Sequence, residues 1–233
     1  MLGATGDTGK PLLKKALENG HQITAIVRDA SKIAEKHHNL NVIQADIFNF
    51  EDLAPIFKGQ DAILSVLGFP KQIERKMTKF TDSMEAILKA MKMAEIKRIV
   101  TISAWYTNRQ TRQGQYMFDN MWSKVPGLVN TLDNEGEMDQ ILAQSEFDFT
   151  SVLVPTLTWD PETQKDILTE EGKTWVENGS GLMTREDVAR FMLKVVENES
   201  FKRKAVAVSV KYSQQEFNEA LERMKKHMAQ YIK

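Results

Sequence analysis

The sequence predicts a single α/β domain in which a mainly parallel sheet carries helices on both faces. Three observations predict this doubly wound arrangement. Short runs of β-branched and aliphatic residues alternate with longer segments of helical period along the chain. The runs are apolar at successive positions, which is typical of strands that helices cover on both sides. A glycine-rich turn also stands directly before the first helical segment.

Six apolar runs are predicted to form strands. They span residues 23–27, 41–45, 62–67, 98–102, 149–154 and 205–210. Pro11 suits the first turn of the first helix and Gly20 suits its end. An apolar stripe over 77–91 predicts another helix. Two late helices are expected at the capping-box-like sequences 184–187 and 213–216.

The first strand of this arrangement is nearly absent from the sequence. Only Met1 and Leu2 precede the glycine turn, whereas a strand usually has ~5–6 residues. The first strand is central in such sheets. Unpaired backbone groups on its neighbours would cost on the order of 1–3 kcal/mol each. We therefore expect a truncated first strand, and a native chain that starts several residues upstream.

Three glycines at positions 3, 6 and 9 form G-x-x-G-x-x-G, a variant of the dinucleotide-binding fingerprint. The first permits a tight turn, the second lets the backbone approach a pyrophosphate, and the third lets helix and strand pack closely. The next helix points its N-terminal dipole at the phosphates. This predicts a Rossmann-like domain. The expected contacts in the turn are Gly3, Thr5, Gly6, Asp7, Thr8 and Gly9.

The loop after the strand at 23–27 bears on the choice between NAD and NADP. Arg28, Ser31 and Lys32 offer charge and donors for a 2′-phosphate. Asp29 is the counter-argument, because a carboxylate there can hold a free ribose. A third interpretation is a solvated turn. We predict NADP(H).

Composition excludes several other classes of function. Lys and Arg total 31 against 32 Asp and Glu, so no global charge favours nucleic acid or a membrane surface. There is no cysteine, and the four histidines are scattered, so no metal site is expected. No apolar stretch approaches the ~20 residues of a membrane span, and no signal peptide is evident. We expect a cytoplasmic protein.

Most of the chain, in order, resembles the biliverdin-IXβ reductase / NADPH flavin reductase family of atypical short-chain dehydrogenases/reductases. The matching stretches are GATGDTG (3–9), VRDASKI (27–33), QADIF (44–48), GQDAILSVLG (59–68), AMKMAEIKRIVTISA (90–104), KVPGL (124–128), MDQILAQSEFDFTSVLVP (138–155) and MTREDVARFMLKVV (183–196). The regulatory proteins of nitrogen metabolite repression share much of this framework.

The resemblance implies further cofactor contacts. Asp46 and Ile47 are expected near the adenine, although Asp46 can also cap a turn. The nicotinamide side is expected at Leu67, Gly68, Ser103, Ala104, Pro155 and Thr156. This chain departs from the family at Glu135 and Thr156, where members often carry histidine. Its segment between residues 104 and 124 is longer, and its terminal helix is an extension.

The residues support flavin-type chemistry better than alcohol or ketone chemistry. None of the four tyrosines is followed by lysine four positions later, so the usual Tyr-x-x-x-Lys acid is absent. Hydride transfer to a flavin mainly requires two stacked rings. Ser103 is the candidate catalytic residue. Its hydroxyl can orient the carboxamide of the nicotinamide or a substrate carbonyl, or it can simply form a hydrogen bond with the backbone of the loop.

The long loop after residue 104 is rich in aromatic residues. It forms either an adaptable lid over a flat substrate or a small satellite core. The candidate substrate contacts are Trp105, Tyr106, Tyr116, Phe118, Trp122 and Glu135.

We thus predict one NAD(P)-binding domain over 1–233, with a substrate side at 104–131 and 155–183 and a C-terminal helical extension at 213–232. The expected function is an NADPH-dependent reductase of a flavin, biliverdin-like or other planar acceptor. The alternative is a non-catalytic NADP(H)-binding redox sensor. A monomer or weak homodimer is expected.

Overall fold

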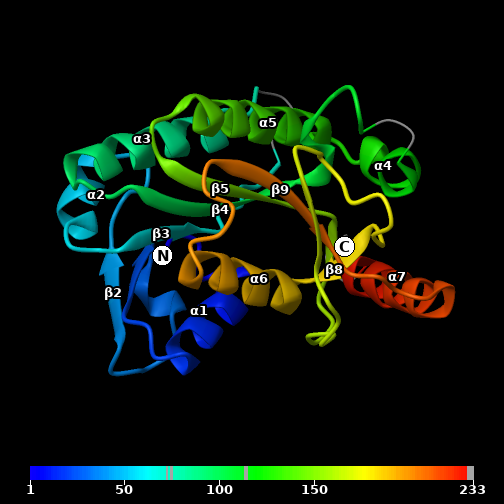
Figure 1. The fold of residues 1–233 in the computed structure, drawn as a ribbon, viewed down its shortest axis with the longest axis horizontal. Helices are drawn as coiled ribbons and strands as arrows, with labels where there is room; N and C mark the ends of the chain where they lie inside the picture. Colours follow the sequence, from blue (N-terminus) through cyan, green and yellow to red (C-terminus); the bar gives the residue numbers. More distant parts are fainter. Residues whose placement is uncertain (72, 74–75, 113–114, 230–233) are drawn as a thin grey trace.

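The computed structural model describes residues 1–71, 73, 76–112 and 115–229. Its central sheet is covered on both faces by helices (Figure 1). One part of the sheet holds β1 (Ile23–Val27) and β2 (Leu40–Gln44). The other part holds, in spatial order, β3 (Ala62–Ser65), β4 (Arg98–Ala104), β5 (Asp148–Val154), β9 (Lys204–Ser209) and β7 (Leu168–Glu171). Every pairing is parallel except that of β7 with β9.

Leu2 joins the two parts of the sheet. It forms parallel bridges to Ile26 of β1 and to Ser65 of β3. The Leu2 amide donates to the Leu64 carbonyl at 2.8 Å, and the Val66 amide donates to the Leu2 carbonyl at 3.1 Å. The order across the sheet is therefore β2, β1, Leu2, β3, β4, β5, β9 and β7, which confirms the doubly wound arrangement. In this order the first strand is present only as a bridge at Leu2.

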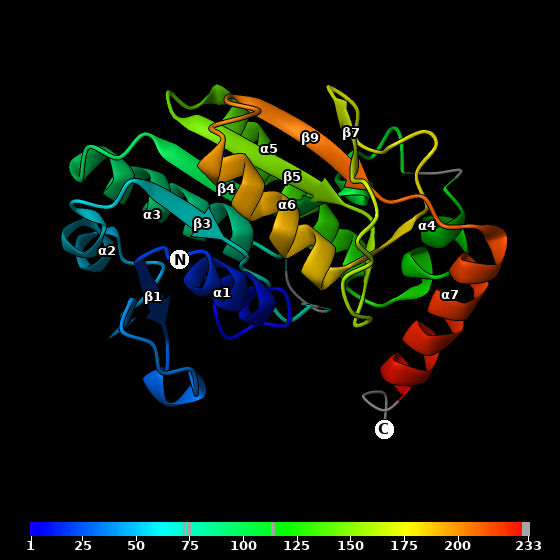
Figure 2. The ribbon, with the colours of Figure 1, turned by 60° about the horizontal axis from the view of Figure 1, so that its bottom comes forward.

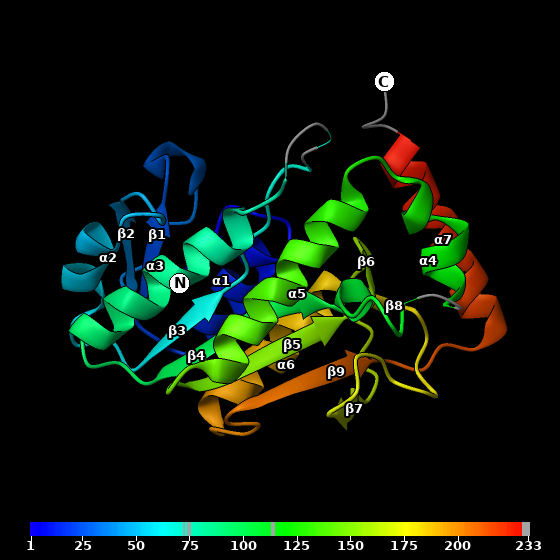
Figure 3. The ribbon, with the colours of Figure 1, turned by 90° about the horizontal axis from the view of Figure 1, so that it is seen from above.

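Helices cover the sheet in two layers. On one face lie α1 (Gly9–Glu18) and α6 (Arg185–Glu197), which are side by side in Figure 2. On the other face lie α2 (Phe50–Phe57), α3 (Lys79–Met93) and α5 (Leu128–Gln144), as Figure 3 shows from above. Each layer buries its own apolar cluster against the sheet. The predicted helical stripe over 77–91 is the inner face of α3.

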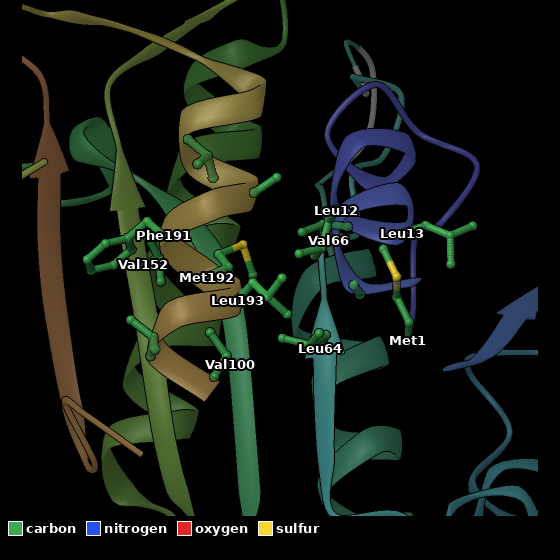
Figure 4. Packing of buried hydrophobic residues seen from close by; sticks show 14 of the residues in the cluster. Met1, Leu12, Leu13, Leu64, Val66, Val100, Val152, Phe191, Met192 and Leu193 are labelled. Atoms are coloured by element: carbon green, nitrogen blue, oxygen red, sulfur yellow. The ribbon is translucent and has the colours of Figure 1, made fainter. Parts of the chain in front are cut away.

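The first cluster packs helix α1, which follows the glycine turn, against the sheet and α6. Leu12 of α1 is fully buried, and Leu64 of β3 and Met192 of α6 belong to the same cluster (Figure 4). Burying a side chain of this size contributes about 1.5–3 kcal/mol. The start of α1, which follows the turn directly, is thereby held above the sheet.

The capping box predicted at 213–216 is complete, whereas Thr184 forms only the N-cap half of the one predicted at 184–187. The Thr184 hydroxyl accepts from the Asp187 amide at 3.0 Å at the start of α6. At the start of α7 (Gln214–Ala229), the Ser213 amide donates to Glu216 at 2.7 Å, and the Glu216 amide donates to the Ser213 hydroxyl at 3.3 Å. Residues 230–232 of the predicted extension lie outside the described part of the chain.

The C-terminal end of the sheet carries shorter elements. These are β6 (Thr156–Thr158), paired with β8 (Leu182–Thr184), the helix α4 (Tyr116–Asn120), and the 3₁₀ turns η1 (Ala30–Lys32), η2 (Trp105–Thr107) and η3 (Trp122–Lys124). The apolar face of α7 packs here on its own chain, through Leu221 and Met224. Among the described helices, none combines the length and apolar character that crossing a membrane requires.

Candidate cofactor and acceptor cleft

A cleft of about 600 Å³ opens at the carboxyl ends of the central strands. This is where open α/β sheets bind their ligands. Its wall includes the glycine turn, the end of β1, the loop after β3, the end of β4 and one face of α5. The predicted site residues in this wall are Gly3, Thr5, Gly6, Asp7, Thr8, Arg28, Ile47, Leu67, Gly68, Ser103, Ala104, Glu135 and Pro155.

The three glycines of the turn have three different environments. Gly3 has φ +82°, and a Cβ there would lie 2.5 Å from the Val66 carbonyl oxygen. A Cβ at Gly9 would lie 1.9 Å from the Gly3 carbonyl oxygen. At Gly6 the nearest such atom is 3.4 Å away, and Gly6 faces the cleft. Gly3 and Gly9 are therefore required by the fold, and Gly6 leaves the backbone open toward a ligand. These residues fit a dinucleotide pyrophosphate.

The loop after β1 presents a cation at the cleft. Arg28 is exposed and lines it, while Lys32 lines a neighbouring cavity of about 590 Å³. The Asp29 carboxylate accepts from the Ser31 amide at 3.0 Å and from the Ser31 hydroxyl at 2.6 Å. These bonds to Ser31 lower the pKa of Asp29. Asp29 thus closes the turn η1, and it is Arg28 that is turned toward the cleft.

At the other end of the cleft, Ser103 is tied to a carboxylate on α5. Its hydroxyl donates to Asp139 Oδ2 at 2.7 Å, and the Ser151 hydroxyl donates to Asp139 Oδ1 at 2.6 Å. Burial raises the pKa of Asp139 to about 6, although hydrogen bonds from Ser151, Ser103 and Thr107 lower it. With Asp139 ionised, Ser103 donates its hydroxyl hydrogen to Asp139, and a lone pair of the Ser103 oxygen is available to the cleft.

Glu135 lies one helical turn before Asp139 on α5 and lines the cleft. Burial, together with the charge of Asp139, raises the pKa of Glu135 to about 8. Glu135 is thus mainly a neutral carboxylic acid near pH 7. Within the described part of the chain, its carboxyl group has no hydrogen-bond partner.

All five aromatic residues predicted to contact substrate lie outside the wall of the cleft. Trp105, Tyr106 and Phe118 are buried in a third apolar cluster with α7 residues. Tyr116 is 62% exposed. Trp122 donates from its ring nitrogen to the Thr156 hydroxyl at 2.7 Å. The structure therefore makes this segment a satellite core, because its rings have the apolar face of α7 to pack against.

Five predicted cofactor residues also lie outside the cleft wall, namely Gly9, Asp46, Thr156 and, in the loop after β1, Ser31 and Lys32. Gly9 is buried behind the turn, where it allows close packing. Asp46 is exposed and accepts from the Phe48 amide at 3.0 Å, so it caps a turn. Thr156 is 5% exposed and is engaged by Trp122.

The comparisons with known proteins agree with this geometry. A family model described as NAD(P)H-binding matches residues 3–199, which include the glycine turn, both helical layers and the end of β4. The chain belongs to this NAD(P)H-binding family. The predicted nicotinamide cofactor is thereby confirmed at the level of the family.

Individual relatives are more distant. YwnB of Bacillus subtilis is 26% identical over 175 residues, which are 74% of this chain and 78% of that protein. A short-chain dehydrogenase/reductase of Veillonella parvula in complex with NADP has a TM-score of 0.71 at 19% identity, covering 89% of this chain and 92% of that one. A candidate NADH-flavin reductase of Streptococcus pneumoniae has a TM-score of 0.67 at 17% identity, covering 90% and 97%. The two solved structures share the fold.

Sequence reasoning missed a cation in the NAD(P)H cleft. Arg185, at the start of α6, lines the cleft on the same side as Asp7. Burial lowers the pKa of Arg185 to about 10, and Asp7 raises it. Arg185 also stacks on Trp159, with its guanidinium carbon 3.9 Å from the ring centre. The sequence did not mark Arg185 as a residue of the cleft, because the segment 184–187 predicts only the start of a helix.

Trp159 connects the glycine turn to α7. Its ring nitrogen donates to Asp7 Oδ2 at 3.0 Å, and its ring stacks on His227 of α7 at 4.0 Å between centroids. The neighbouring Asp160 accepts from Arg223 of α7 at 2.7 Å and 3.3 Å. Asp7 therefore has a structural role besides its position near the phosphates.

Two further aromatic residues line the cleft. Phe69, in the loop after β3, and Phe80, on α3, meet edge to face at 4.9 Å between ring centroids. Phe80 belongs to the predicted apolar stripe of α3, which by itself indicates a core residue. Phe69 and Phe80 thus form an apolar part of the cleft wall.

Proposed function

We propose that this chain is an NADPH-dependent reductase of a flavin or a similar planar acceptor. When bound, NADPH supplies a hydride from C4 of its nicotinamide ring. The observation that carries the proposal is the arrangement of one cleft: a glycine turn with a free cation, Arg28, at one end, and Ser103 with apolar and aromatic neighbours at the other.

Each part of the cleft has a separate task. Gly6 and the N-terminus of α1 bind the pyrophosphate, and Arg28 binds the 2′-phosphate. Ser103 accepts a hydrogen bond from the carboxamide of the cofactor, because its own proton is donated to Asp139. Phe69 and Phe80 exclude water and present an apolar wall to a flat ring.

The described tyrosines support an acceptor other than a simple alcohol or ketone. None of them lines the cleft. Tyr106, the nearest in sequence to Ser103, is buried, and its burial raises its pKa to about 12. A catalytic tyrosine requires the opposite shift. The resemblance to flavin and biliverdin reductases points the same way, as does the fold shared with a candidate flavin reductase.

A second candidate function is an NADP(H) sensor. It is favoured by the contact between Asp7 in the glycine turn and Trp159, which stacks on α7. A conformational change at the phosphate-binding turn would be transmitted through Trp159 to α7, whose outer face is exposed. In this case the cofactor is a ligand and no acceptor is reduced.

One assay separates the two candidates. Purified protein is mixed with NADPH and FMN, FAD, a quinone or biliverdin, and absorbance is followed at the nicotinamide band. We expect oxidation that depends on the acceptor and saturates with it. Tight NADPH binding without oxidation by any of these acceptors would reject the reductase and favour the sensor.

A further inference from the structure

Helix α5 separates the cofactor cleft from a second cavity of about 670 Å³, which is distinct from the cavity beside Lys32. Ser103 and Glu135 line the first, whereas Asp139 and Thr107 line the second. The helix can approach η2 closely because residue 136 is glycine. A Cβ there would lie 2.8 Å from the Thr107 carbonyl oxygen. The two cavities are therefore only one layer of side chains apart at this point.

Ser103 and Asp139 bridge that layer. The Ser103 side chain is 2% exposed and reaches Asp139 Oδ2 at 2.7 Å. The other oxygen of Asp139 is held by Ser151 at 2.6 Å, and Ser151 is 1% exposed. The Thr107 hydroxyl donates to the Ala104 carbonyl at 3.1 Å, and Thr107 lowers the pKa of Asp139. Both oxygens thus have fixed partners, and one of those partners lies in the cleft wall.

We propose that Asp139 relays protons from the second cavity to the Ser103 hydroxyl, which delivers them to the acceptor in the cofactor cleft. This inference rests on the proposed reductase function. Ser103 is then the catalytic residue that touches the acceptor, and Asp139 is a positioning residue that acts through it.

The proton and electron balance of this relay is complete. The acceptor gains a hydride, with its two electrons, from the reduced cofactor, which becomes NADP⁺. Once Asp139 is protonated, its Oδ2–H donates to the Ser103 oxygen, and the Ser103 hydroxyl hydrogen turns toward the cleft. The Ser103 O–H bond then breaks as a proton moves to the nitrogen or oxygen atom of the acceptor that is conjugated with the hydride site. Ser103 regains a proton from Asp139 Oδ2, and the Asp139 carboxylate regains one from solvent in the second cavity.

The charged groups around Asp139 are consistent with a carboxyl group that gains and loses a proton. Glu135 lies one turn before it on the same helix, and the charge of Asp139 helps to raise the pKa of Glu135, which keeps Glu135 mainly neutral. In the second cavity, Arg109 is paired with Asp133 at 2.8 Å, and Lys173 lies 3.5 Å from Glu170 and from Glu177. Among the described residues, the hydroxyls of Ser103 and Ser151 donate hydrogen bonds to the Asp139 carboxylate. Its raised pKa keeps its proton exchangeable near neutral pH.

The kinetic test compares wild type with Asp139→Asn, which keeps the volume of the side chain. Glu146→Gln, an exposed acid beyond the end of α5, is the matched control. With FMN or a quinone and saturating NADPH, we expect Asp139→Asn to lower kcat about 10- to 100-fold. KM and the Kd for NADPH should stay within about twofold. The fall of wild-type kcat above about pH 6 should disappear in the variant.

Asp139→Glu serves as the conservative variant and should restore part of kcat. Wild-type kcat and pH profile in Asp139→Asn would overturn the relay alone. A wild-type protein that binds NADPH but reduces no acceptor would overturn the proposed function, and the relay with it.

A second readout needs neither cofactor nor turnover. Infrared difference spectra of the free protein between pH 4 and pH 9 report carboxyl protonation. We expect a band that titrates near pH 6, is missing in Asp139→Asn, and shifts in Ser103→Ala because the hydrogen bond is lost. A band for Asp139 that titrates near pH 4 and ignores Ser103→Ala would contradict the relay.

Discussion

The two ends of the cleft differ in what determines their structure. At the glycine turn, function depends on backbone geometry over the seven consecutive residues 3–9, and each glycine has a defined neighbour. At the acceptor end, the wall combines side chains from the loop after β3, from α3, from β4 and from α5. The first kind of site is local in sequence, whereas the second exists only after tertiary packing. Substitutions at the two ends should therefore fail in different ways.

The largest effect is expected for Gly9→Ala. The added Cβ would lie 1.9 Å from backbone, so helix α1 or the turn must move. We expect a loss of about 3 kcal/mol in the free energy of unfolding and no measurable NADPH binding. Chemical denaturation and fluorescence titration measure both quantities.

Gly6→Ala is the matched control for this comparison. Its Cβ has no contact shorter than 3.4 Å, so stability should be unchanged while NADPH affinity falls on the order of tenfold. Equal stability losses in the two variants would contradict the separate roles given to the two glycines.

The next effect is expected at Arg28. Arg28→Ala removes the charge-assisted contact to the 2′-phosphate, worth about 1.5–3 kcal/mol. NADPH affinity should fall about 10- to 100-fold, while NADH affinity stays nearly constant. Calorimetric titration with both cofactors measures this, and Lys36→Ala in the same loop is the control. Equal losses for NADPH and NADH would remove Arg28 from the 2′-phosphate site.

At the acceptor end, Glu135 predicts a dependence of stability on pH. Its folded-state pKa of about 8 lies above the ordinary value. Between pH 4 and 8 the folded protein holds a proton that the unfolded chain releases, so stability falls as the pH rises. The expected loss between pH 6 and 8 is on the order of 2 kcal/mol. Glu135→Gln should flatten this slope in thermal melts, and an unchanged slope would contradict the burial of the carboxyl group.

The smallest effect is expected at the contact between α7 and the Trp159 segment. Arg223→Gln removes an exposed ion pair with Asp160, and we expect a loss of about 0.5 kcal/mol. NADPH affinity should change less than twofold, because Trp159 keeps its bonds to Asp7 and its stacking on Arg185. A large loss of affinity would indicate that α7 helps to form the cofactor site and would favour the sensor function.

The sequence predicted the parts of this protein that depend on local pattern. The positions of six strands, the start of α7 and the glycine turn follow from periodicity and residue type, and the structure confirms them. Asp139 was missed, although its spacing of four from Glu135 places both carboxylates on one face of α5. Arg185 and Trp159 were missed because their roles depend on segments distant in sequence.

The aromatic loop shows why the acceptor end was harder to predict. A cluster of large rings fits a lid as well as a core, and composition cannot decide between them. The apolar face of α7 decides it here, because it buries Trp105, Tyr106 and Phe118. Phe80, by contrast, was expected in the core and also lines the cleft.

The most direct test of the central claim is a crystal structure of the protein with NADP⁺. We predict that the pyrophosphate lies on the backbone at Gly6, the 2′-phosphate at Arg28 and the nicotinamide beside Ser103 and Ala104. Electron density for the cofactor in the neighbouring cavity beside Lys32, with the cleft at Ser103 free, would contradict the account.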